Sequence, residues 1–131
     1  MKKIIKTDQG PAPVAPYNQA IVANGVVYVS GQVALDPATG ALDKKAMKSI
    51  KKETKRVMKN LKAVLKAANS NFDQVLKCTI FMANMNDYAA INKVYGKYFD
   101  ADTAPAREAV AVSRLPKSVN VEISCIALVK K

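Results

Sequence analysis

Residues 119–129 read VNVEISCIALV, and this short stretch decides the fold. Its apolar residues fall on both sides of an extended chain: Val121, Ile123 and Cys125 on one, Ile126 and Leu128 on the other. A run of this length and composition is typical of a strand inside a sheet. Because both of its sides are apolar, both faces of that sheet need to be covered by other parts of the molecule.

The first part of the chain indicates strands and turns. Residues 10–16 are rich in proline and form an extended arm. Two short β-type runs then flank Asn24-Gly25, which is the strongest short signal for a hairpin. Pro37 and Gly40 mark the turn that follows them.

Two later segments have the spacing of amphipathic helices. In residues 44–69, apolar side chains recur at steps of three and four positions. The rest of that helix carries Lys48, Lys51, Lys52, Lys55, Lys59, Lys62 and Lys66. Residues 86–99 form the second helix, with Asn86 or Asp87 as its cap. Residues 74–83 and 106–112 are predicted to be strands.

The resulting order is strand, strand, helix, strand, helix, strand, strand. This order predicts an α+β fold, a single mixed β-sheet with two helices packed on one face, in a single domain over residues 1–131. Two helices can cover only one face of a sheet of this size. The apolar face that they leave bare predicts association between copies of the chain.

The composition narrows the class of protein. Half of the 131 residues are hydrophobic, and no apolar run approaches the roughly 18 residues of a membrane span. The basic N-terminus lacks the apolar segment of a signal peptide, so we expect a cytoplasmic protein without a membrane partner. The net charge of +11 fits either an anionic partner such as nucleic acid or a well-solvated surface.

The absence of histidine is the most restrictive feature of the composition. It excludes Ser-His-Asp triads, His-paired cysteine nucleophiles, HExxH zinc sites and ribonuclease mechanisms that use paired histidines. Cys78 and Cys125 lie in apolar stretches and cannot form a four-ligand zinc site by themselves. We expect them to be buried, unreactive thiols, and we expect no metal site.

An arginine stands where the stretch TAPAREAVAV, residues 103–112, begins to look like a buried strand. The guanidinium of Arg107 is always charged, and its burial without a partner is costly. Glu122, an acid inside the last strand, is one candidate partner, and the two would then form a plain ion pair between strands. In the alternative, Arg107 binds the carboxylate of a ligand, while Glu122 moves a proton or positions a water.

The chain resembles the RidA/YjgF family of reactive-intermediate deaminases over nearly its whole length, in segments that occur in the expected order. These segments are PYNQAI, VSGQV, DPATGAL, VLKCTIFMANMNDYAAINKVYGKYF, PAR, RLPKSVNVEI and IALV. The resemblance implies a chorismate-mutase-like fold and a homotrimer with clefts between its subunits. It also implies the hydrolysis of 2-imino acids or their enamine tautomers, such as 2-iminobutanoate and 2-iminopropanoate, to 2-keto acids and ammonia.

The resemblance also implies roles for single residues. Arg107, the arginine of the PAR motif, would bind the substrate carboxylate, and Glu122 would position or deprotonate the attacking water. The positions that match the lining of the family's cleft are Tyr17, Ser30, Gly31, Asn92 and, through its backbone, Ala109. No cofactor is implied, because a protonated imine is already electrophilic.

The chain departs from the family pattern at several positions, which bear on substrate range more than on the reaction. Ala109 stands where bacterial relatives often carry cysteine, so a thiol is not essential there. Glu108 adds a negative charge beside the arginine unless it points away, as alternation along a strand predicts. The segment 99–107 is short, and Ser124 stands where a second acid is common.

Two alternatives to an imine deaminase stay open. Some members of the family carry an endoribonuclease label, and lysines of residues 44–69 could contact RNA phosphates in a salt-sensitive way. Against this, no aromatic residues lie between those lysines for stacking on bases. The second alternative is a non-enzymatic protein that binds a small carboxylate such as a 2-keto acid, which would need Arg107 equally.

Overall fold

The computed structural model describes residues 1–131 and contains one six-stranded sheet with the order β1-β2-β3-β6-β4-β5. All neighbouring strands are antiparallel except β4 and β5, which are parallel, so the sheet is mixed, as predicted. The strands are β1 (Lys3–Ile5), β2 (Ala20–Ala23), β3 (Val26–Gln32), β4 (Val75–Met82), β5 (Ala106–Ala111) and β6 (Val121–Leu128). The helices are α1 (Ile50–Ala67) and α2 (Tyr88–Tyr95).

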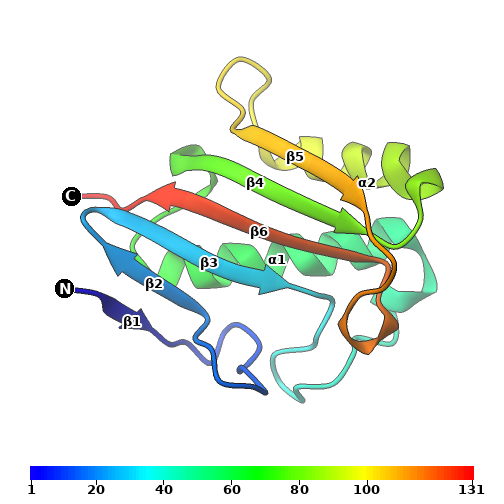
Figure 1. Cartoon of the computed structure of the whole chain (residues 1–131), viewed down its shortest axis with the longest axis horizontal. Helices are drawn as coiled ribbons and strands as arrows, with labels where there is room; N and C mark the ends of the chain where they lie inside the picture. The colour runs from blue at the N-terminus through cyan, green and yellow to red at the C-terminus, as the bar shows by residue number, and fades with distance from the viewer.

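Both helices lie on the same side of the sheet, as Figure 1 shows. The core between the two layers includes Leu61 and Val64 of α1 and Val27, Ile80 and Ile123 of the sheet, all fully buried. Each large apolar side chain buried in this way stabilises the fold by about 1.5–3 kcal/mol. The predicted arrangement of two helices on one face is therefore confirmed.

The other face of the sheet is bare within the single chain (Figure 1). Alternation along the strands turns Tyr28, Val110 and Leu128 to this side, and they are 50%, 45% and 41% exposed. Three large apolar side chains on one open sheet face are an unfavourable arrangement for a chain that stays alone in water. The face is available for contact with a second copy.

The first strand was not predicted. β1 contains only three residues and pairs with β2 at the edge of the sheet. Its sequence is too short to show the alternation that identifies a strand. The predicted hairpin is confirmed, because Asn24 and Gly25 both have positive φ angles, of 52° and 77°, between β2 and β3.

The predicted helix over residues 44–69 is shorter in the structure. Ser49 is extended, with φ −153° and ψ 152°, and its side chain accepts a hydrogen bond from the Lys52 amide, so α1 begins only at Ile50. A separate 3-10 turn over Ala46–Lys48 precedes it, and Asp43 accepts from the Ala46 amide there. Two successive caps therefore divide a segment for which the apolar spacing predicts one continuous helix.

The second predicted helix, over residues 86–99, is likewise divided. Its α-helical part is α2, and single 3-10 turns lie on either side, at Met85–Asp87 and Gly96–Tyr98. Asp87, one of the two expected caps, stands at the N-cap position of α2, but its side chain makes no capping hydrogen bond. The side-chain cap belongs to the preceding 3-10 turn, where Asn84 accepts from the Asn86 amide. Neither helix of the chain has the length and apolar character needed to cross a membrane.

Candidate functional site

Arg107 lies near the start of β5, the edge strand beside β4. In the ladder between these strands it stands opposite Cys78, whose side chain is buried on the helix side of the sheet. The guanidinium therefore faces α2. Its Nη1 donates a hydrogen bond of 2.6 Å to Asn92 Oδ1, and its Nη2 donates one of 3.0 Å to the hydroxyl oxygen of Tyr88.

Two aromatic rings complete the surroundings of the guanidinium. Arg107 Cζ lies 5.7 Å from the ring centroid of Tyr88 and 5.1 Å from that of Tyr95, distances at which a cation is attracted to the ring. Tyr88, Asn92 and Tyr95 follow one another at steps of four and three, so one face of α2 presents them together. We call these three residues and Arg107 the arginine cluster.

The sequence did not predict the contact of these two tyrosines with the arginine. The signal that could have found them is the helical spacing around Asn92, which was already a candidate. Ala109 stands opposite Ile80 on the same side of the sheet as Arg107 and is half-buried, so the structure brings these two candidates together.

No carboxylate neutralises Arg107. The only ion pair of the chain joins Lys77 Nζ and Glu108 Oε1 at 2.6 Å, and Glu108 points away from Arg107, as predicted. The prediction of a buried strand was wrong here, because β5 is an edge strand whose residues are exposed or half-buried. A half-buried arginine keeps part of its hydration and tolerates neutral partners, so its charge stays available to an anion.

The ion pair between Arg107 and Glu122, one of the two alternatives left open by the sequence, is absent, and the sheet separates the two side chains. β4 lies between β5 and β6, with Cys78 opposite both Arg107 and Cys125. Glu122 is three positions from Cys125 along β6 and points to the bare face, about 10 Å further along the strand. Within a single chain, the candidate acid and the candidate anion-binding group therefore do not meet.

Glu122 instead lies against Gly31 of the neighbouring strand β3. A Cβ atom at Gly31 would stand 2.5 Å from Glu122 Oε2, so only glycine lets the carboxylate lie there. The pairing of β3 with β6 shifts between Val29 and Gln32, so the strand is irregular at Ser30-Gly31. Burial raises the pKa of the Glu122 carboxyl above its ordinary value.

Ser30 links this region to the extended arm. Its hydroxyl donates to the carbonyl oxygen of Asn18, next to Tyr17, which is 47% exposed. The structure thus places Tyr17, Ser30, Gly31 and Glu122 in one connected part of the chain, which we call the carboxylate cluster. The predicted site residues form two separate groups, and the single chain does not bring them together.

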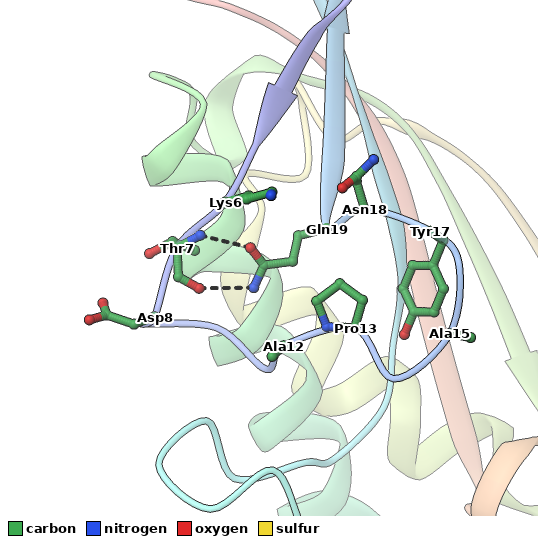
Figure 2. A pocket seen from close by; sticks show the side chains of 9 residues that line it. All are labelled: Lys6, Thr7, Asp8, Ala12, Pro13, Ala15, Tyr17, Asn18 and Gln19. Carbon is green, nitrogen blue, oxygen red and sulfur yellow. Dashed lines mark hydrogen bonds between the residues drawn. The ribbon is translucent and has the colours of Figure 1, made fainter.

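Tyr17 also lines a cavity of about 660 Å³ formed by the arm (Figure 2). Gln19, which is buried, holds the arm closed, because its Oε1 accepts from the Thr7 amide and its Nε2 donates to the Thr7 carbonyl. This cavity does not include Arg107. The arginine cluster remains the stronger candidate, because there a permanent cation, two neutral hydrogen-bonding side chains and two aromatic rings converge.

The remaining chemically notable side chains offer no competing centre. Cys78 and Cys125 are buried, and burial raises the pKa of both thiols, which keeps them protonated and unreactive. The lysines of α1 named above are exposed on the side away from the sheet and form no ion pair. No three His, Cys, Asp or Glu side chains lie close enough to hold a metal ion.

The chain and its fold are similar to those of known proteins. The family model described as Endoribonuclease L-PSP matches residues 7–129. A RutC family protein of Synechocystis is 51% identical over 96% of this chain and 95% of its own. The 2-iminobutanoate/2-iminopropanoate deaminase of Mus musculus is 41% identical over 98% and 92%. The crystal structure of TdcF from E. coli with bound serine covers 98% of this chain and 99% of its own, at 35% identity and a TM-score of 0.87. The chain therefore belongs to the RidA/YjgF family, also described as the endoribonuclease L-PSP or RutC family.

Proposed function

We propose that this protein hydrolyses reactive 2-imino acids, or their enamine tautomers, to 2-keto acids and ammonia. The observation that carries the proposal is Arg107, a permanent cation whose partners in the chain are the neutral Asn92 and Tyr88. Mammalian relatives about 40% identical to this chain are named for deamination of 2-iminobutanoate and 2-iminopropanoate. Both substrates carry the carboxylate that a guanidinium binds well.

Hydrolysis of the imine needs a positioned substrate, an attacking water and one group that transfers protons. Arg107 holds the substrate carboxylate, which fixes the C=N carbon in place. Glu122 accepts a proton from water as the water oxygen attacks the carbon of the protonated imine, and it returns this proton to the nitrogen of the carbinolamine that forms. As the C–N bond then breaks, the carbinolamine hydroxyl becomes the ketone oxygen and gives its proton to Glu122. The 2-keto acid leaves, and ammonia takes that proton and leaves as ammonium. The raised pKa of Glu122 suits a group that must both accept and return a proton near neutral pH.

We infer that the working site lies between subunits of a homotrimer. Support comes from the separation of Arg107 and Glu122 by the sheet, and from the bare apolar face that carries Tyr28 and Leu128. A contact between the arginine cluster of one subunit and the carboxylate cluster of the next would complete the set of groups. Such a head-to-tail contact closes into a ring when its rotation allows, and three copies are the number that the family resemblance implies.

The experiment follows ammonia release from 2-iminobutanoate that a dehydratase generates in the same vessel. We expect the wild-type protein to accelerate this release and the Arg107→Ala variant to lose the acceleration. Arg107 is half-buried at a sheet edge, so the variant should keep the thermal transition and oligomeric state of the wild type. Lys117→Ala, which alters a cation in the loop before β6, is the matched control and should stay active. Full activity in Arg107→Ala would refute the assignment.

A further inference from the structure

We propose that the hydroxyl of Tyr88 is a second carboxylate-binding group, which donates a hydrogen bond to the same ligand carboxylate as Arg107. The inference rests on the proposed function, because it assumes that Arg107 binds a ligand carboxylate. It assigns to Tyr88 a direct contact that goes beyond the residues predicted from the sequence.

The hydroxyl oxygen of Tyr88 is the acceptor in its hydrogen bond with Arg107. Arg107 has only donors, so in the 3.0 Å bond its Nη2 donates and the oxygen of Tyr88 accepts. The O–H proton of Tyr88 is therefore free to be donated elsewhere. No acceptor in the chain takes it, and the side chain is 37% exposed, so the proton is directed towards solvent or a ligand.

A bound carboxylate can accept more hydrogen bonds than Arg107 alone donates to it. A guanidinium has five N–H groups, and Asn92 and Tyr88 each take one, so about three stay free for a ligand. A carboxylate has two oxygens with about four lone-pair sites, more than one edge of the guanidinium can satisfy. A carboxylate oxygen bound beside Nη2 lies next to the phenol, whose proton can fill one of the remaining sites.

Two contacts with Arg107 hold the phenol of Tyr88 in place. The Tyr88 ring lies 5.7 Å from Arg107 Cζ, and its hydroxyl bonds to the same guanidinium, so two contacts keep the side chain beside the cation. Asn92 lies on the next turn of α2, and its side-chain oxygen accepts a hydrogen bond from Arg107 Nη1. This bond occupies one N–H group of the guanidinium. Tyr88 therefore adds the proton of its hydroxyl to the donors that the arginine cluster offers an anion.

The test uses Tyr88→Phe, which removes only the hydroxyl, and measures binding of 2-oxobutanoate and of its neutral amide by titration calorimetry. We expect the variant to bind the carboxylate about tenfold more weakly, as for loss of a hydrogen bond to a charged group, and the amide only about twofold more weakly. In the imine assay KM should rise by a similar factor while kcat changes little, because the contact exists before and during the reaction.

Tyr98→Phe is the matched control, because it removes the same atom from a tyrosine that packs against Phe72 and is not part of the arginine cluster. It should bind both ligands as the wild type does. An Arg107→Lys background separates direct contact from an effect on the arginine. There, Tyr88→Phe should still weaken carboxylate binding, and no further loss would overturn the direct contact.

The outcomes also separate this inference from the proposed function. If Arg107→Ala abolishes binding and activity while Tyr88→Phe binds 2-oxobutanoate as tightly as the wild type, only the role of Tyr88 is refuted. If Arg107→Ala keeps full activity, the proposed function fails. Equal weakening of the carboxylate and the amide by Tyr88→Phe would also overturn the inference, because it would show no preference for the charge.

Discussion

Arg107 and Glu122 point to opposite faces of the same sheet, with strand β4 between the strands that carry them. The guanidinium is on the helix side, bonded to Asn92, and the carboxylate is on the bare side, against Gly31. A reaction that needs both groups at one substrate therefore needs them from two copies of the chain. If the proposed reaction uses both groups, the oligomer is required for activity and not only for burial of the apolar face.

Mixing two inactive variants tests this condition. We expect Arg107→Ala and Glu122→Gln to be inactive alone and to regain activity when the two chains are refolded together. If each site takes its arginine from one subunit and its acid from the next, about a quarter of the sites in a random equal mixture contain both intact groups. The measurement is the imine hydrolysis rate of the mixture. A mixture of exchanged subunits that stays inactive would show that both groups act within one chain.

A methyl group at Gly31 tests the placement of the acid. The Cβ of a Gly31→Ala variant would stand 2.5 Å from Glu122 Oε2, so the carboxylate must move. Because the displaced atoms are the end of a flexible side chain, we expect thermal stability to change little, while the hydrolysis rate falls at least tenfold. Gly96→Ala, where a Cβ meets nothing within 4 Å, is the control and should keep its activity. Full activity in Gly31→Ala would remove Glu122 from the mechanism.

The elevated pKa of Glu122 predicts an acidic limb in the pH profile. Burial disfavours the charged carboxylate, and a base must be deprotonated, so the rate should fall as the pH drops through the raised pKa. The sign for stability is the reverse: the folded state holds this proton more tightly than the unfolded chain, so this group stabilises the fold at low pH and less as the pH rises. The wild-type rate measured against pH reports the acidic limb. We expect Glu122→Gln to lose this component of the pH dependence of urea unfolding.

The pattern of the sequence was sufficient for the fold, because alternation in residues 119–129 and periodicity in residues 44–69 reflect burial directly. Pairing of the strands was not accessible in the same way. Nothing in the spacing of Arg107 and Glu122 says that β4 lies between their strands, nor to which face each side chain turns. The ion pair considered from sequence failed for this reason, and the partners of Arg107 came from a helix.

Local helix capping was a second feature that the sequence pattern did not predict. Ser49 interrupts a segment whose apolar spacing continues on both sides, and the interruption depends on one hydrogen bond to the Lys52 amide. Periodicity is insensitive to a single extended residue, so the predicted helix began six positions too early, at residue 44 rather than Ile50. The family motifs identified candidate site residues one by one. The contacts of Tyr88 and Tyr95 with Arg107 depend on the packing of α2 beside β5, which only the structure shows.

Glu53 is the fully buried acid of α1, and its removal should be the most costly single change to the fold among its charged residues. Its carboxylate accepts from the backbone amides of Asn120 and Val121 and from the side chain of Asn120. These bonds fix the start of β6 at Val121, one residue before Glu122. Glu53→Ala leaves these donors unpaired in the interior, so we expect a loss of about 3 kcal/mol in the free energy of unfolding, measured in urea. Lys52→Ala, its exposed neighbour, should change that free energy by less than about 0.5 kcal/mol. Equal effects of the two substitutions would mean that the Glu53 bonds do not hold β6 in place.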